Sequence, residues 1–255
     1  THKNNKETRM ENLVALEQSA HQHIKIDTQK AQSHAENINM IPVVMAELNQ
    51  IAVQQPIVFA KNSETGEFTL NALLGFEQHE NLFYQHSQWQ GVYLPLQLQR
   101  QPFFVGDTHA KQTQYPVCIN LNSPAVINNQ AQSQNDLEPI YTQNAEESGY
   151  FKKIKQCLGH LLQGEIDNKK LIDTLLQHEL LQPLSIEVTF QNSQKTKLNG
   201  LYTINQERLA QLDSDQITLL HQRALLPAIY TVITSLGQIY PLIERKNAVL
   251  NLADD

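Results

Sequence analysis

Histidines are the residues of this chain whose type and spacing best suit metal chemistry, because a neutral imidazole is a common transition-metal ligand. Among the ten histidines, His34 lies two residues before Glu36, a spacing that would place both side chains on one face of a strand. A third ligand from His79, His86 or His109 would complete the two-histidine, one-carboxylate set that binds iron(II) in oxygenases. Such a pair is expected by chance among ten histidines, and His34 lies in a polar stretch. We therefore predict no metal site and no cofactor, with an iron(II)-dependent oxygenase-like enzyme as the alternative.

Other sequence patterns mainly disfavour particular classes of enzyme or binding protein. The chain has no GxGxxG or GxxxxGK[ST] sequence to bind phosphate groups, and no GxSxG sequence to present a serine nucleophile. Cys118 and Cys157 belong to no CxxC motif and no Cys/His cluster, which is typical of free thiols in a reducing compartment. The net charge of -7 disfavours nucleic-acid binding, which normally needs clustered lysine and arginine. These patterns leave open whether the protein is an enzyme.

Aromatic residues and one arginine are concentrated between residues 81 and 104. Trp89, Tyr93 and Phe103 supply rigid aromatic surface, and Arg100 can pair with a carboxylate or stack on a ring. Together with Asn81 they form our candidate ligand-binding site. The alternative is that the aromatic residues are core and that Arg100 anchors them through hydrogen bonds to loop carbonyls.

The elements that must position these residues follow from the spacing of apolar side chains. Alternation with period two predicts strands, and apolar residues recurring at three and four predict amphipathic helices. The expected strands cover residues 24–26, 55–60, 68–74 and 115–127 and the hairpin 185–190 with 197–204; residues 55–60 and 68–74 form another hairpin. The expected helices cover 40–53, 150–162, 171–180 and a last long helix. Asp213 and Gln216 resemble a capping box at the start of this last helix, with Pro227 and Pro241 as kinks or breaks. Strands in the first half and helices in the second predict an α+β fold.

The length of 255 residues allows one large domain or two closely packed lobes, and we favour one domain. Residues 1–11 are expected to be a disordered start or residues left from cloning. The domain would cover residues 12–255, strand-rich over 12–127, a loop over 128–149 and helix-rich over 150–255. The longest apolar run, 224–236, is well short of the roughly 20 residues that cross a bilayer, so it predicts a core helix and no membrane span. No secretory signal is recognisable, which predicts a cytoplasmic protein.

Four stretches carry a resemblance to a known bacterial family. They are IPVVMAELNQ at 41–50, QQPIVFAK at 54–61, LLGFEQHENLFY at 73–84 and WQGVYLPLQLQRQPFF at 89–104. These stretches resemble signatures of the SapC-like family, and a thinner similarity continues through 118–120, 200–202 and 235–236. The family often has two adjacent arginines before the Pro-Phe pair, whereas this chain has Arg100 followed by Gln101. Gln101 is therefore given no charged role.

The resemblance implies a role more than a reaction. The family takes its name from a surface-layer association, has no agreed reaction, and is often encountered beside genes for outer-membrane receptors, cupin-like proteins and flavin halogenase-like proteins. This implies a non-catalytic binding or accessory protein that handles a peptide or an imported nutrient, with a protein or peptide as partner. A surface-layer associated protein is a further alternative, disfavoured by the lack of a recognisable export signal.

Overall fold

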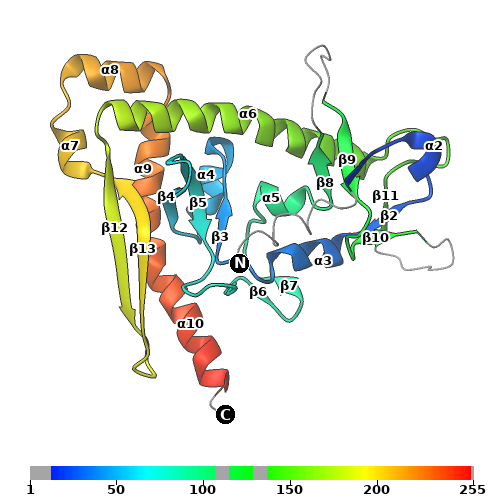
Figure 1. Ribbon diagram of the computed structural model, residues 1–255, viewed down its shortest axis with the longest axis horizontal. Coiled ribbons are helices and arrows are strands. Elements are labelled where there is room, and N and C mark those ends of the chain that lie inside the picture. The colour runs from blue at the N-terminus through cyan, green and yellow to red at the C-terminus, as the bar shows by residue number, and fades with distance from the viewer. Residues whose placement is uncertain (1–12, 107–114, 129–136, 254–255) are drawn as a thin grey trace. The chain divides into compact units, whose positions relative to one another are not determined.

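The computed structural model describes residues 13–106, 115–128 and 137–253 (Figure 1). The chain divides into two compact units. The first is Thr1–His34, His86–Gln88 and Leu96–Leu161, and the second is Ala35–Gln85, Trp89–Pro95 and Leu162–Asp255. The single domain predicted for residues 12–255 stays a prediction, and the predicted irregular start at 1–11 lies outside the described residues.

Two small antiparallel sheets form the first unit, with strand orders β1-β9-β8 and β10-β2-β11. The strands are β1 (Leu13–Ala15), β2 (Lys25–Asp27), β8 (Phe103–Val105), β9 (Val117–Asn120), β10 (Val126–Ile127) and β11 (Leu137–Pro139). The helices are α2 (Gln18–His21), α3 (Thr28–Ala31), η1 (Gln32–Ala35), α5 (Leu96–Gln99) and the first turns of α6 (Gly149–Gln177). Ile26, Phe103, Ile119 and Ile140 are fully buried and belong to one core cluster. The strands predicted near 24–26 and within 115–127 therefore carry the core of this unit.

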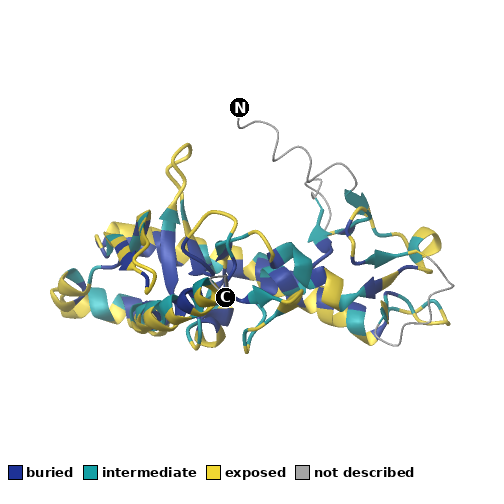
Figure 2. Cartoon of the chain, turned by 90° about the horizontal axis from the view of Figure 1, so that it is seen from below, coloured by how far each residue is buried: buried dark blue, intermediate teal, exposed yellow. Residues whose placement is uncertain are grey.

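A five-stranded antiparallel sheet of order β12-β13-β4-β5-β3 organises the second unit. Its strands are β3 (Met40–Pro42), β4 (Ile57–Lys61), β5 (Phe68–Leu73), β12 (Leu181–Thr189) and β13 (Lys195–Ile204). Both predicted hairpins are confirmed, since β4 pairs with β5 and β12 pairs with β13. Ile57, Val58 and Phe59 in the central strand are fully buried. Buried residues are dark blue in Figure 2. A short two-stranded ladder, β6 (Tyr84–Gln85) with β7 (Gln88–Trp89), follows β5 in sequence.

The C-terminal part of the chain supplies most helices of the second unit. They are the rest of α6, α7 (Gln206–Ala210), α8 (Ser214–Gln222), α9 (Leu226–Ser235), η3 (Leu236–Gln238) and α10 (Ile239–Ala253). The predicted capping box is confirmed, because Asp213 accepts from the Gln216 amide at 2.8 Å and the Gln216 side chain accepts from the Asp213 amide at 3.1 Å. α9 packs on β13 and β4, and the Ser235 hydroxyl accepts a 2.9 Å bond from the Ile57 amide. The fold is α+β, as predicted.

The prediction of two separate helices over 150–162 and 171–180 is wrong, because α6 is continuous. Gly164 suggested a break since glycine has low helix propensity. A Cβ at position 164 would lie 2.4 Å from Cβ of Val44, so the glycine permits a close approach that a side chain would prevent. The helix keeps its residue of low propensity because packing at this position requires one without a side chain.

The helix predicted over 40–53 is only partly confirmed. This segment forms β3, then η2 (Met45–Glu47), then α4 (Leu48–Ile51). β3 is an edge strand, where a proline such as Pro42 is tolerated because one side of the strand needs no donor. The Glu47 carboxylate accepts from the Val44 amide at 3.1 Å and so caps the turn that follows the strand. Similarly, His34 lies in η1, so the strand assumed for the pair His34 and Glu36 does not form.

Candidate functional site

Asn81, the first of the predicted site residues, is buried in the second unit. Its Nδ2 donates to the carbonyl oxygen of Ala35 at 2.8 Å, and its Oδ1 accepts from the amide of Phe83 at 2.8 Å. The side chain thus holds the turn that leads into the aromatic stretch. Both polar ends of the amide have partners within the same unit.

Trp89 and Tyr93 lie in the same unit and are bonded to each other. The indole Nε1 donates to the Tyr93 carbonyl oxygen at 2.9 Å, and the Tyr93 hydroxyl donates to Oε2 of the buried Glu47 at 3.1 Å. The Trp89 ring stacks on Phe83 with centroids 5.6 Å apart, and the Arg245 guanidinium lies 4.4 Å from the same phenyl ring. Asn81, Trp89 and Tyr93 are therefore linked through Phe83 into one aromatic cluster.

Arg100 and Phe103 belong to the first unit. The Arg100 Nε donates to Gln97 Oε1 at 2.7 Å, its Nη1 donates to the Phe103 carbonyl at 2.8 Å, and its guanidinium lies 4.2 Å from the Phe104 ring. The Phe103 side chain is fully buried, with its ring 5.6 Å from that of Phe151. The half-buried guanidinium of Arg100 thus finds acceptors among neighbouring residues of its own segment. A ligand-binding role for the five predicted residues stays a prediction.

The metal-site alternative finds no ligand set in the part of the chain that the structure describes. No group of three or more histidine, cysteine, aspartate and glutamate side chains lies together there. His34 Nε2 lies 3.2 Å from the hydroxyl of Ser123, while His109 lies outside the described residues.

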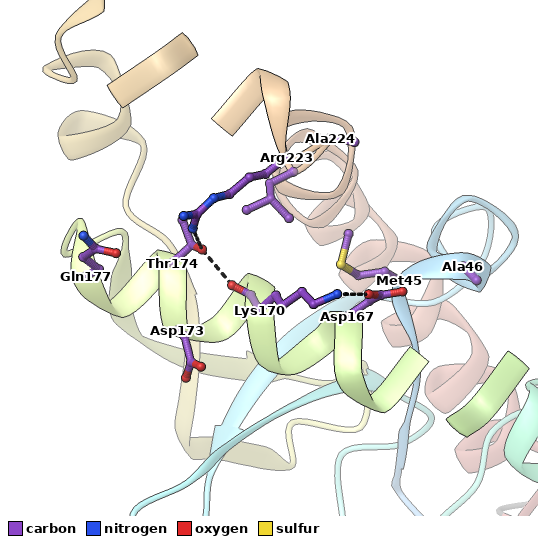
Figure 3. A pocket seen from close by; sticks show the side chains of 10 residues that line it. Met45, Ala46, Asp167, Lys170, Asp173, Thr174, Gln177, Arg223 and Ala224 are labelled. Carbon is purple, nitrogen blue, oxygen red and sulfur yellow. Dashed lines mark hydrogen bonds and ion pairs between the residues drawn. The ribbon is translucent and has the colours of Figure 1, made fainter. Parts of the chain in front are cut away.

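A cavity of about 850 Å³ in the second unit is a site that the sequence did not indicate (Figure 3). We call it the α6 cavity. Its walls come from α6, from η2 and from the corner between α8 and α9. It is lined by Met45, Ala46, Asp167, Lys170, Asp173, Thr174, Gln177, Arg223, Ala224 and Leu225. These residues come from three separate segments, so no local motif announces the site.

Arg223 is placed at the cavity by the way α8 ends. It is the C-cap residue of α8, and Ala224 after it has a left-handed backbone with φ of 55°. The Ala224 amide bonds to the His221 carbonyl and the Leu225 amide to the Leu220 carbonyl, each at 2.9 Å. This pair of bonds is the Schellman arrangement, which fixes the direction of the chain after a helix. The Cα of Arg223 is therefore held rigidly.

The far end of the Arg223 side chain is held by α6. Its Nη1 donates to Thr174 Oγ1 at 3.1 Å, and the Thr174 hydroxyl donates in turn to the Lys170 carbonyl oxygen at 2.7 Å. Thr174 is 2% exposed, so its hydroxyl is a fixed acceptor. Within the described residues, the Arg223 side chain makes this one hydrogen bond and pairs with no carboxylate.

The other charged residues of the lining are paired. Lys170 Nζ lies 3.0 Å from Asp167 Oδ1, and Lys169 Nζ lies 3.1 Å from Asp173 Oδ2. The pKa of Asp167 lies below its usual range because the Gln163 amide and then Lys170 donate hydrogen bonds to its carboxylate. In Figure 3 the Asp173 side chain points away from Arg223. Among the lining residues that the structure describes, Arg223 is thus the cation that has no acidic partner.

The apolar part of the cavity faces this arginine from η2 and the start of α9. Met45 is half-buried, Leu225 is 3% exposed, and Ala46 and Ala224 are exposed to the cavity mouth. Asn168 fixes η2 on α6, since its Oδ1 accepts from the Met45 amide at 3.0 Å and its Nδ2 donates to the Val43 carbonyl at 2.7 Å. The cavity therefore combines one unpaired cation with an apolar wall, both on fixed backbone.

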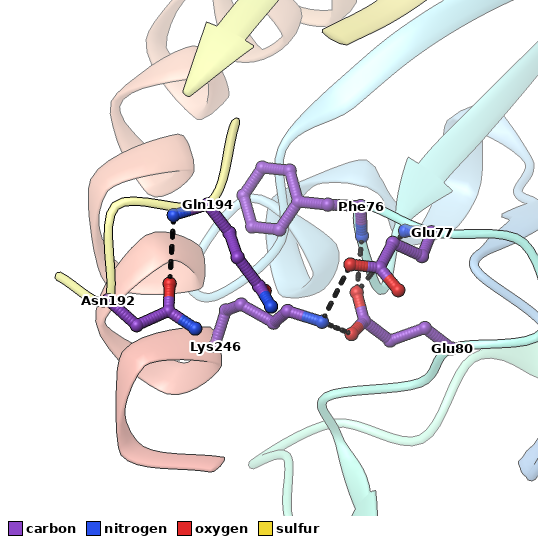
Figure 4. A network of polar contacts seen from close by, with 6 residues as sticks. All are labelled: Phe76, Glu77, Glu80, Asn192, Gln194 and Lys246. Atoms are coloured by element: carbon purple, nitrogen blue, oxygen red, sulfur yellow. Dashed lines mark hydrogen bonds and ion pairs between the residues drawn. The ribbon is translucent and has the colours of Figure 1, made fainter. Parts of the chain in front are cut away.

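The stretch Leu226–Asn251 is long and apolar enough to cross a membrane by length and composition, with 28% of its apolar window buried, although a core helix meets the same criteria. Within this stretch α10 is held by polar contacts (Figure 4). Lys246 Nζ lies 2.5 Å from Glu80 Oε1 and 3.0 Å from Glu77 Oε1, and the Gln191 amide donates to Asn247 Oδ1 at 3.1 Å. Burial lowers the pKa of Lys246, but hydrogen bonds to Glu80 and Glu77 outweigh it and raise the pKa above its usual range.

Comparison with known proteins assigns the chain to a family. No curated protein and no solved structure matches this chain. The family model described as SapC matches residues 16–242 of the 255 residues. The matched region includes the aromatic cluster and every residue that lines the α6 cavity. The protein is therefore a member of the SapC family.

Proposed function

We propose that the protein is a non-catalytic binding protein whose ligand occupies the α6 cavity. The observation that carries this proposal is the cavity itself, whose volume of about 850 Å³ lies in the range typical of small-ligand sites. Its lining combines a few polar groups with apolar side chains, which is the usual composition of such sites. The walls are a long helix, a capped turn and a Schellman corner, so the site is largely formed before a ligand arrives.

The lining supports binding more than catalysis. The Thr174 hydroxyl already donates to a main-chain carbonyl, and Lys170 is paired with Asp167, so neither is an activated nucleophile. The Asp167 carboxyl has a pKa below its usual range, which makes it a weak general base near neutral pH. Histidine and cysteine do not occur among the lining residues that the structure describes.

For the biological role we propose the one that the resemblance to the family implies. The protein would act in the cytoplasm as an accessory to the handling of a peptide or an imported nutrient, in contact with a protein or peptide partner. Cell fractionation that recovers it outside the cell would overturn this location and favour a surface-layer association.

The test is to block the cavity and look for lost binding. Ala46→Trp places a large side chain at the mouth, away from Arg223, and Ala210→Trp is a matched control at an exposed alanine of α7 outside the cavity. Wild-type protein isolated without an affinity tag would be screened by native mass spectrometry and thermal shift against peptides and small metabolites. Hits would be measured by calorimetry, and melting temperatures would confirm that both variants fold.

We expect a hit that binds wild type and Ala210→Trp alike and loses about tenfold or more in affinity with Ala46→Trp, because the added ring fills the site. A screen without hits, or hits that bind folded Ala46→Trp as well as wild type, would refute the proposal.

A further inference from the structure

We propose that the α6 cavity recognises a carboxylate attached to an apolar body, with Arg223 binding the carboxylate and Thr174 positioning Arg223. This inference rests on the proposed function, since it names the ligand class of the same cavity. The shared chemistry can come from a free carboxylic acid or from the C-terminus of a peptide, and the experiment below separates the two sources.

The N–H groups of Arg223 that Thr174 does not use are the first observation in favour of a carboxylate ligand. A guanidinium has five N–H donors in one plane, and within the described residues one nitrogen, Nη1, is used by Thr174. The Nε and Nη2 edge remains, and two parallel N–H groups match the two oxygens of a carboxylate. The side chain reaches this position from α8 and extends over α6 toward Thr174 (Figure 3).

Thr174 fixes the orientation of the Arg223 guanidinium. Its hydroxyl proton is committed to the Lys170 carbonyl, so the oxygen presents a lone pair to Arg223 and cannot reverse its role. The Schellman corner holds the other end of the arginine. A side chain held at both ends loses little conformational entropy when a ligand binds, which favours affinity.

The charges of the lining favour a carboxylate over a phosphate. Lys170 and Arg223 are offset by Asp167 and Asp173, so the formal charge of the described lining is balanced before a ligand binds. A dianionic phosphate would be repelled by the two carboxylates, whereas a single negative charge can pair with Arg223 alone. The apolar wall, formed by Met45 and Leu225, then suits an uncharged apolar group next to the carboxylate.

Three probes test the inference by calorimetry: N-acetyl-Ala-Ala-Leu with a free C-terminus, the same peptide as its C-terminal amide, and hexanoate. We expect the free-carboxylate peptide or hexanoate to bind, with the peptide acid about tenfold or more tighter than its amide if the source is a peptide. Hexanoate binding as tightly as the peptide acid would identify a free acid as the source.

Variants separate recognition from folding. Arg223→Lys should weaken the carboxylate probes about tenfold or more, because an ammonium lacks the bidentate edge, while Arg208→Lys, an arginine outside the cavity, should not. Thr174→Val should reduce the ratio of acid to amide affinity, and Thr174→Ser should restore it, because serine keeps the hydroxyl. A merely structural threonine would change both affinities together.

Two outcomes refute the inference. One is that wild type binds no carboxylate probe at about 5 mM, well above the Kd of a weak ligand. The other is that acid and amide bind equally and Arg223→Lys changes neither. If a screened ligand is nevertheless blocked by Ala46→Trp, the proposed function stands and the carboxylate assignment alone fails.

Discussion

The indole Nε1 of Trp89 donates a 2.9 Å hydrogen bond to the carbonyl oxygen of Tyr93. This bond closes the tight segment around Gly91, where a Cβ would lie 2.5 Å from the same indole nitrogen. The segment is part of the stretch by which the chain resembles its family. Its aromatic residues are tied to Phe83 and Glu47 in the same unit, so the motif has a scaffolding role whatever else it does.

Truncation of Trp89 should be costly. Trp89 is half-buried, and Trp89→Ala loses the stack on Phe83 and the bond to Tyr93, so we expect a loss of about 2 kcal/mol in the free energy of unfolding. Trp89→Phe keeps a ring but loses the N–H donor and should cost about 1 kcal/mol. Urea unfolding of both variants measures these values. A change within about 0.5 kcal/mol for the alanine variant would indicate that Trp89 acts at the surface.

Two glycines of α6 should respond oppositely to alanine. Gly164→Ala would drive a Cβ into Val44 and should destabilise by about 1–3 kcal/mol, because the contact involves an atom next to the backbone. Gly159→Ala has no atom within 4 Å of the added Cβ and should stabilise by about 0.5–1 kcal/mol through helix propensity. Urea unfolding gives both values. Equal effects at the two positions would disprove the close approach of Val44 to α6.

The αL residue beside Arg223 offers a gain in stability. Ala224→Gly should stabilise by about 0.5–1 kcal/mol, because glycine adopts a φ of 55° without the steric cost that alanine bears. Ala228→Gly, inside α9, is the control and should destabilise by about 1 kcal/mol. Thermal melts of the pair check this. An Ala224→Gly protein that melts below wild type would show that the corner is not the Schellman end described above.

Lys246 should make the protein sensitive to alkaline pH. Its side chain is 7% exposed, and the pair with Glu80, itself 15% exposed, should be worth about 2 kcal/mol when broken by Lys246→Met. Lys155→Met, which removes an exposed pair with Glu147, should cost less than about 1 kcal/mol. Urea unfolding near neutral pH measures both.

The raised pKa of Lys246 determines how the stability of the protein changes with pH. Because the pKa of Lys246 is raised in the folded protein, its contribution is fully present below the usual lysine pKa and is lost as pH rises through the raised value. The stabilities of wild type and Lys246→Met should therefore begin to converge above about pH 10.5 and meet above the raised pKa. A difference that stays constant from neutral to strongly alkaline pH would show that the lysine packs without its charge mattering.

Sequence alone determined the local and repetitive features. Alternating apolar residues established the β4–β5 and β12–β13 hairpins, because neighbouring strands joined by a short turn need no distant information. Asp213 and Gln216 marked the start of α8 for the same reason, since a capping box is contained in four residues. The α+β class followed from patterns of this kind, and the family was indicated by the four stretches that resemble its signatures.

Only the tertiary structure decided the features that depend on distant partners. In the sequence Gly164 is typical of a helix end. In the structure Val44, far away in sequence, occupies the space that a side chain at position 164 would need. Likewise Arg223 and Thr174 are 49 residues apart, and each alone is an ordinary helix residue. Their meeting in the α6 cavity depends on how α8 and α6 pack, because a site built from separate segments exists only when long-range packing brings them together.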